Sequence, residues 1–521
     1  MMIQRARLLT VSAGVALAVG ASACNNDSLT NINKNPNSPE DVPATTLFTT
    51  AARNSASYWL GSGYNNREAS FVAQHLAEQQ YPDEDRYARL GASDVAFNFG
   101  AYQSQLEDLQ QIIRKGVAAK DPGTSAPASI LQVYNFSYLT NTFGDIPYFQ
   151  SLEGDSVGST TTPKYDSQQA IYTDMFAKLD AATKALSSAK ASLGSADPIY
   201  GGDPGEWQKF ANSLRARLAI TIVNVDKATA SAQLQAAFAA PGGVITSNAD
   251  NTLFPWPGDG VYNNPWSDFF KGRDDDRMSQ TLVNIMNANN DPRVGIYAQP
   301  LPGTTNVYAG MPNGLAAASA SKYANTASRV GAIMFPGATA YGNFGGSGAS
   351  FPSFMMTAAE VNFIKAEAAE RGLGGLTPGQ AAGFYNAAIT ASMNQWGITN
   401  GGTIAAYLAQ PSVAYKGGTA GLDQIAVQKY VALFTDGGEA WTEWRRTCQP
   451  TTVIPGPAAI NSQVPRRFMY APNEYAVNGA AVAAAAAALG PNGDSFNGRM
   501  WWDSAPTNAP TYPGASCGQK P

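Results

Sequence analysis

Long segments without proline, in which apolar residues recur at helical spacing, leave this chain few choices of fold. Between residues 168 and 186, Ile171, Met175, Phe176 and Leu179 recur every three or four positions, which places them on one face of a helix. The same spacing predicts helices around residues 106–113 and at 207–225, 358–371, 378–393 and 422–434. We therefore expect amphipathic helices that pack as antiparallel pairs.

The predicted helix pairs lie in both halves of the chain, on either side of a segment of different composition. Residues 241–353 are rich in Gly, Pro, Asn and aromatic residues, and this composition indicates loops with short elements at most. No exact internal repeat is visible. Helix pairs at both ends of the chain favour a mainly α, tetratricopeptide-like stack with a loop-rich subdomain.

The first 24 residues have the order of an export signal. Arg5 and Arg7 precede a mostly apolar run at residues 8–19, which is too short to span a bilayer of ~30 Å as a helix. Ala21-Ser22-Ala23 then precedes Cys24, and this resembles the lipobox read by the bacterial lipoprotein signal peptidase, although leucine is most usual where Ala21 stands. We expect lipid on Cys24 to hold the protein on a membrane. An ordinary secretory signal cleaved at the same bond is the alternative.

Three parts of the chain follow from this N-terminus. Residues 1–23 are the predicted lipoprotein signal peptide, residues 24–43 the lipidated N-terminus and a polar tether, and residues 44–521 the folded domain. Loss of residues 1–23 removes two arginines and no acid, so the formal net charge changes from −5 to −7. An acidic chain of this kind offers no broad basic surface to nucleic acid.

The chain contains three cysteines, of which Cys24 is assigned to the lipid. Cys448 and Cys517 remain as an even pair in an oxidising compartment, so we predict a disulfide between them, with two free thiols as the alternative. His75 is the single histidine, and no Gly-x-Ser-x-Gly or His-Glu-x-x-His motif occurs. The sequence therefore has almost none of the residues that histidine-based hydrolysis or zinc binding requires. We expect no cofactor, no metal, and a structural or surface role for His75.

Acidic residues leave two further interpretations open. Asp274-Asp275-Asp276 is the densest acidic cluster, and adjacent carboxylates could share a Ca²⁺ ion. Arg273 and Arg277 flank the cluster, so a solvated turn at the start of a helix is the favoured interpretation. Catalysis by two separate carboxylates also stays open, because 39 acidic residues offer too many pairs for the sequence to select one.

Motifs spread over most of residues 25–503 follow one another in the order of a known family. They are Asn31-x-Asn33-x-x-Pro36-Asn37, the turn Thr142–Tyr148, the tryptophan-containing stretch Trp207–Ala219, Asp291-Pro292-Arg293, Gly438–Trp441 with Arg445-Arg446, and Pro465–Phe468. Together they resemble the SusD/RagB family of outer-membrane nutrient-binding lipoproteins, and in particular its second, SusD-like branch.

The resemblance implies a helical superhelix that binds its ligand without catalysis. A member of this family is expected to sit on the outer membrane by its lipid anchor, exposed at the cell surface. It would capture an oligosaccharide or a peptide and deliver it to a SusC-type TonB-dependent transporter. An extracellular carboxylate-based glycoside hydrolase, and a lipid-anchored assembly module without a small ligand, are the alternatives.

Aromatic residues on polar loops are the candidates for ligand contact, because sugar rings stack on aromatic faces while polar side chains bind the hydroxyls. An alternative for each is a loop aromatic packed against the scaffold. Six positions meet the criterion of a polar or glycine- and proline-rich neighbourhood: Tyr64, Tyr81, Tyr87, Trp256, Tyr262 and Trp266.

Overall fold

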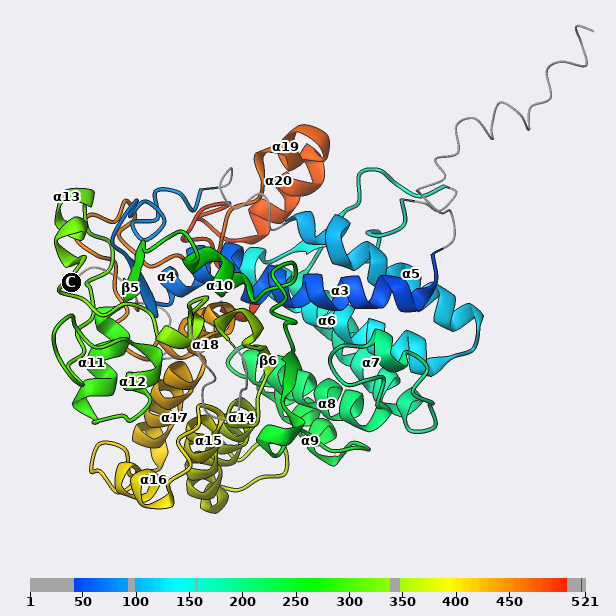
Figure 1. Cartoon of the computed structure of the whole chain (residues 1–521). Coiled ribbons are helices and arrows are strands. Elements are labelled where there is room, and N and C mark those ends of the chain that lie inside the picture. Colours follow the sequence, from blue (N-terminus) through cyan, green and yellow to red (C-terminus); the bar gives the residue numbers. More distant parts are fainter. Residues whose placement is uncertain (1–41, 92–98, 155–157, 338–346, 504–516, 518–521) are drawn as a thin grey trace, which may run out of the picture.

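The fold is a stack of helices in which neighbours along the chain pack against each other. The structure is a computed structural model that describes residues 42–91, 99–154, 158–337, 347–503 and 517. Most described residues are helical, and the stack winds around a buried centre (Figure 1). The predicted mainly α, tetratricopeptide-like fold is therefore confirmed. The principal helices are α3 (Ala44–Leu60), α5 (Glu107–Ala118), α6 (Pro122–Phe143), α7 (Gln168–Leu186), α8 (Pro204–Thr221), α9 (Lys227–Ala239), α14 (Ala358–Glu370), α15 (Ala381–Gln395), α16 (Gly401–Leu408), α17 (Gly418–Ala432) and α18 (Gly437–Thr447).

Capping residues explain why several helices begin where the sequence predicts. The Ser167 side chain accepts a hydrogen bond from the amide of Ala170 at the start of α7, and Asp203 caps α8 just before a proline at the first helical position. Thr357 caps α14 in the same way. A cap satisfies amides that lack a partner within the helix, and it fixes the first residue.

Residues 241–353 form the loop-rich part of the molecule, as predicted. The short helices α11 (Gln280–Ala288), α12 (Val294–Tyr297) and α13 (Ala317–Ala320) lie together along one edge of the stack (Figure 1). The helix α10 (Pro265–Phe270) reaches back over α4 (Ser70–Val72) and the π-helical segment η1 (Ser62–Ala69). At the other end of the chain, α19 (Pro472–Val477) and α20 (Gly479–Ala488) form a hairpin; α20 contains the alanine run of the sequence.

Three short antiparallel pairs of strands tie the loops to the helices. The strand β1 (Leu76–Glu78) pairs with β5 (Asp276–Met278), so that Glu78 lies directly opposite Asp276. The other pairs are β2 (Ile146–Pro147) with β3 (Tyr165–Asp166), and β4 (Thr252–Phe254) with β6 (Ser353–Met356). The first and third pairs join segments that are distant in the sequence.

A network of buried charges lies where the two halves of the stack meet. Arg217 on α8 donates two hydrogen bonds to Glu360 on α14, at 2.6 and 2.5 Å. Arg446 on α18 donates to Glu367 on α14 at 2.6 Å through each of two nitrogens, and to Glu443 at 2.5 Å. All these side chains are buried. The pairs therefore link α8, α14 and α18 in a region of low dielectric constant, where an unpaired charge is costly.

The same network includes one lysine. The Lys429 ammonium on α17 lies 3.1 Å from a carboxylate oxygen of Glu443. Burial alone would raise the pKa of Glu367, but the guanidinium groups of Arg446 and Arg371 lower it to about 2. The Glu367 carboxylate therefore stays ionised across the physiological range.

Cys448 ends α18 and is bonded to Cys517 in the structure, with the two Cα atoms 5.6 Å apart. This disulfide fastens residue 517 to the end of a buried helix. Among the described residues, no helix is both long enough and apolar enough to cross a bilayer. Cys24 and the motif at residues 31–37 lie outside the described residues.

Replacing Arg217 by methionine should lower the free energy of unfolding by about 3–5 kcal/mol, because buried Glu360 would lose two hydrogen bonds and keep only the Lys429 ammonium, 4.0 Å away. Urea denaturation followed by circular dichroism measures the change. Lys184→Met is the control: Lys184 pairs with Asp180 on the surface and its side chain is 71% exposed. This control should cost no more than ~1 kcal/mol. Equal losses for the two variants would contradict a central role for the buried network.

Candidate functional site

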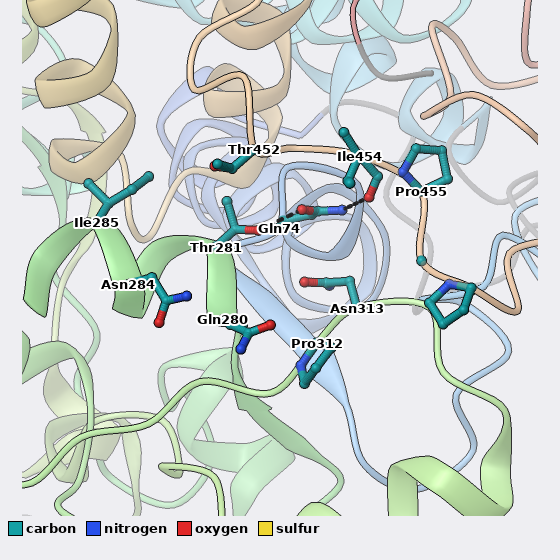
Figure 2. A pocket seen from close by; sticks show the side chains of 12 residues that line it. Gln74, Gln280, Thr281, Asn284, Ile285, Pro312, Asn313, Thr452, Ile454 and Pro455 are labelled. Atoms are coloured by element: carbon teal, nitrogen blue, oxygen red, sulfur yellow. Dashed lines mark hydrogen bonds between the residues drawn. The ribbon is translucent and has the colours of Figure 1, made fainter. Parts of the chain in front are cut away.

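One concave site combines unused polar groups with apolar walls. It is a cavity of about 350 Å³ between α11 and the segment 452–457, and this volume lies in the range of small-ligand sites. Figure 2 shows that side chains from four separate parts of the chain point into it. We call it the amide pocket; its lining is Gln74, Gln280, Thr281, Asn284, Ile285, Pro312, Asn313, Thr452, Ile454, Pro455, Gly456 and Pro457.

Gln74 is fixed at the centre of the amide pocket. Its Nε2 donates to the carbonyl oxygen of Ile454 at 2.5 Å, and its Oε1 accepts from the Thr281 hydroxyl at 2.7 Å (Figure 2). Its backbone has a φ of 57°, a left-handed conformation that a glutamine adopts only when the surroundings enforce it. One side chain thus ties α11 to the segment 452–457.

Asn313 is held just as firmly at the edge of the pocket. Its Nδ2 donates to the carbonyl oxygen of Leu76 and to Asp85 Oδ1, both at 2.7 Å. Its Oδ1 accepts from the Ser279 hydroxyl at 2.5 Å. Gln74 and Asn313 therefore have their polar atoms engaged by the protein and form a rigid frame.

Gln280 and Asn284 are the unused polar groups of the amide pocket. They lie four residues apart, on the exposed side of α11, so their side chains are neighbours on the helix surface. Within the described ranges, neither side-chain amide is hydrogen-bonded to another residue. Each amide offers both donors and an acceptor to a ligand.

None of the residues that line the amide pocket is charged. Transfer of an ionised ligand from water into this pocket would be unfavourable, because no lining residue supplies an opposite charge. A neutral ligand with hydroxyl or amide groups fits the lining. Catalysis by two carboxylates is not possible with the lining residues, because none of them is an aspartate or a glutamate.

Four of the six predicted ligand-binding aromatics are buried, and the prediction that they are exposed is wrong for them. Tyr64, Tyr87, Trp256 and Trp266 each expose 5% or less of their surface. Tyr64 lies in η1 and not in a loop; its hydroxyl is 2.9 Å from that of Thr142. Trp266 lies in the helix α10, whereas Tyr87 and Trp256 lie in irregular segments. A buried ring of this kind packs the scaffold, which was the alternative for each position.

Both buried tryptophans also use their ring N–H within the protein. Trp256 Nε1 donates to the Ser353 hydroxyl and Trp266 Nε1 donates to the carbonyl oxygen of Leu60, each at 2.9 Å. Tyr87 has a different neighbour: a hydrogen bond with the Gln74 side chain partly offsets the effect of burial, which raises the pKa of Tyr87. Tyr87 therefore supports the amide pocket from behind without lining it.

Tyr81 and Tyr262 are the two predicted aromatics that are exposed, at 64% and 46%. Each has an arginine over its ring: the guanidinium carbon of Arg273 lies 5.6 Å from the Tyr81 ring centre, and that of Arg53 lies 5.0 Å from the Tyr262 ring centre. The arginine holds the ring in place. Either tyrosine can offer its other face to a sugar.

Beneath Tyr81 lies a group of buried acids. Glu78 and Asp276 are opposite each other on β1 and β5, where like charges repel. Burial, Glu84 and Asp276 raise the pKa of Glu78 to about 11. Burial also raises the pKa of Asp276 to about 8, against a hydrogen bond from Asn66. These two carboxyl groups are therefore neutral at pH 7, so they do not repel each other.

The acidic run at residues 274–276 is not the solvated turn at the start of a helix that was favoured, because Asp275 and Asp276 are buried and Asp276 begins the strand β5. Asp274 pairs with Arg277 and Arg329, Asp275 pairs with Arg273, and Asp276 accepts from Asn66. The three carboxylates diverge, and the described residues contain no group of three or more acidic, histidine or cysteine side chains that could hold a metal ion.

His75 is buried in the core. Its Nε2 donates to the carbonyl oxygen of Tyr430 at 3.0 Å, and burial lowers its pKa to about 4. The histidine is therefore neutral and structural at physiological pH.

Gln280 and Asn284 are not among the residues that the sequence predicted to contact a ligand. Two features of the sequence could have indicated them. Ser279 caps α11, and Gln280 and Asn284 lie four residues apart on the helix that follows. Leu282, Val283 and Met286 are buried on the opposite side of this helix. Two amides on the free face of a short amphipathic helix mark a surface, but the sequence does not show that other segments wall it into a pocket.

Changing Asp276 to asparagine should weaken the pH dependence of stability. A carboxyl with a raised pKa stabilises the fold fully below the unfolded pKa of ~4, and this contribution is lost as the pH rises through the folded pKa of about 8. The wild-type melting temperature should fall between pH 5 and pH 8, and Asp276→Asn should flatten that fall.

The control is Asp250→Asn, because hydrogen bonds lower the pKa of Asp250 to about 2 against the effect of burial. Its contribution is lost only as the pH falls below ~4. This variant should therefore keep the decrease between pH 5 and pH 8. An Asp276→Asn profile parallel to the wild type would show that Asp276 is ionised in the folded protein.

Comparisons with known proteins agree with this architecture. A family model of the second SusD-like branch, described as "Starch-binding associating with outer membrane", matches residues 36–471. A chitin-binding SusD homolog from Flavobacterium johnsoniae is 27% identical with a TM-score of 0.75, over 90% of this chain and 99% of that one. A structure described as a chitin-binding protein is 26% identical with a TM-score of 0.72, over 89% of this chain and 100% of the other.

A SusD-like protein from Bacteroides thetaiotaomicron is 26% identical with a TM-score of 0.73, and the match covers 88% of this chain and 98% of that one. No curated protein matches the chain. Because the family model spans most of the sequence and these solved structures share the fold along nearly their whole length, the chain belongs to the SusD-like family.

Proposed function

We propose that this protein is a lipid-anchored outer-membrane protein that binds an oligosaccharide in the amide pocket and delivers it to a SusC-type TonB-dependent transporter. The observation that carries the proposal is the uncharged pocket, with two unused amides, in a chain of the SusD-like family. Family membership supports nutrient binding and association with the outer membrane. The ligand, the anchor and the transporter are the parts that experiments must test.

An oligosaccharide is favoured over a peptide as the ligand. The family description names starch, and two of the similar structures are described as chitin-binding. Side-chain amides are the usual partners of sugar hydroxyls, and the exposed ring of Tyr81 offers a stacking surface outside the pocket.

The proposed anchor is Cys24, which lies outside the described residues. Acyl chains on this residue would hold the protein at the membrane, and residues 24–43 would link them to α3. A binding protein held in this way stays beside a transporter in the same membrane, at a high effective concentration.

The enzyme and assembly alternatives have less support. The amide pocket has no carboxylate for glycoside hydrolysis. An assembly module is less well supported because the family description and the similar structures name carbohydrate binding.

Tyr81→Ala should lower the affinity for a bound oligosaccharide about three- to tenfold, because a stacking face is lost. Isothermal titration against a panel of neutral oligosaccharides measures the affinity. Phe149→Ala is the matched control: Phe149 is another exposed aromatic, 49% accessible, on a different loop. No binding to any oligosaccharide, together with binding to peptides, would overturn the proposed ligand class. Unchanged affinity for Tyr81→Ala and Tyr262→Ala would exclude the predicted aromatic contacts.

Cys24→Ser should release a folded, ligand-binding protein from the membrane, because the acylated thiol is removed. Fractionation of cells into membrane and soluble parts measures the release, and binding of the same oligosaccharide shows that the released protein is folded. Wild type and variant are compared in a strain without the transporter, because the transporter could hold the unacylated protein at the membrane. A variant that remained in the membrane fraction of that strain would contradict the lipid anchor.

A further inference from the structure

We infer that the amide pocket recognises the acetamido group of an N-acetylated sugar. This inference rests on the proposed function, since it takes the pocket as the oligosaccharide site. Its basis is the chemistry of the lining: two unused amides beside small apolar surfaces, and no charge.

The two unused amides match the polar atoms of an acetamido group. That group has one N–H to donate and one carbonyl oxygen to accept. Gln280 and Asn284 lie on one face of α11 with Cβ atoms roughly 5–6 Å apart, as expected for this spacing. One side-chain amide can accept from the N–H while the other donates to the carbonyl.

The apolar lining accommodates the methyl group. Ile285 lies directly after Asn284 on α11, and Ile454 and Pro455 form the wall across from it (Figure 2). Gln74 holds Ile454 in place through the hydrogen bond to its carbonyl oxygen. A sugar with a hydroxyl in place of the acetamido group would leave these apolar surfaces in contact with water.

The pocket walls suit a sugar better than a peptide. An extended peptide is bound chiefly by main-chain hydrogen bonds to a strand edge. Here Pro312, Pro455 and Pro457 have no N–H to donate, and the N–H of Gln280 already donates to the carbonyl oxygen of Met311 at 2.7 Å. These walls therefore offer fewer N–H groups to a peptide than a strand edge does.

The absence of charge in the lining also separates an acetylated sugar from its deacetylated form. The free amine of an amino sugar is partly protonated near neutral pH. No lining residue offers a carboxylate to pair with an ammonium group, so the ammonium form would lose hydration without compensation.

The test compares three tetrasaccharides with the same β1,4 linkage, which carry acetamido, amino or hydroxyl groups at the 2-position. Titration calorimetry with the full mature chain should give an affinity for the acetylated tetramer at least about tenfold higher than for the other two. Equal affinity for the acetylated and the hydroxyl tetramer would overturn the inference.

Variants locate the recognition in the amide pocket. Asn284→Ala and Gln280→Ala should each lower the affinity for the acetylated tetramer about tenfold and leave that for the hydroxyl tetramer nearly unchanged. Asn287→Ala is the control on the same helix, because the Asn287 side chain donates to the carbonyl oxygen of Tyr308 and does not line the pocket. Unchanged melting temperatures verify that the exposed substitutions leave the fold intact.

Failure of this inference can be told apart from failure of the proposed function. If both pocket variants bind the acetylated tetramer like the wild type, the acetamido site is refuted, although oligosaccharide binding stands. If none of a wider panel of neutral glycans binds, both the proposed function and the acetamido site are refuted. Selective loss of acetylated binding in Asn284→Ala and Gln280→Ala supports both.

Discussion

The buried ion pairs between α8, α14, α17 and α18 determine how the two halves of the helical stack fit together. Arg217 comes from the first half of the chain and Glu360 from the second, and the pairs around Arg446 continue the contact into α18. Apolar surfaces tolerate small shifts between helices, but buried charges do not, because a shift leaves an ion without its partner. The network therefore favours one register among α8, α14, α17 and α18.

Local patterns in the sequence were sufficient for most of the stack. Helix α7 has the predicted bounds because its apolar spacing and its Ser167 cap agree. Helix α18 was not predicted as a helix, since the stretch from Gly437 to Thr447 contains four charged residues and its buried face is largely ionic. Apolar periodicity does not reveal a helix whose charged side chains are buried against partners on other helices. Those partners are contributed by α14 and α17, which are distant in the sequence.

The candidate site was harder to predict for a related reason. Composition identifies loops that carry aromatic rings, but it does not show which face of the loop meets the core. Trp256 and Trp266 are buried against segments far away in the sequence. The Trp256 ring N–H donates to Ser353, and the Trp266 ring N–H donates to Leu60. The amide pocket likewise combines residue 74, α11, residues 312–313 and residues 452–457. The resemblance to the SusD-like family predicted the scaffold and the class of function, whereas the pocket required the tertiary structure.

The frame of the amide pocket and its two unpaired side-chain amides are separate residues. Gln74 and Asn313 are committed to the protein by their hydrogen bonds, whereas Gln280 and Asn284 lie on the free side of α11. Substitutions at such exposed positions usually change stability by no more than ~0.5 kcal/mol. New side chains can therefore arise at positions 280 and 284 without loss of the fold. Under the proposed function, a change of ligand preference at these two positions therefore leaves the scaffold intact.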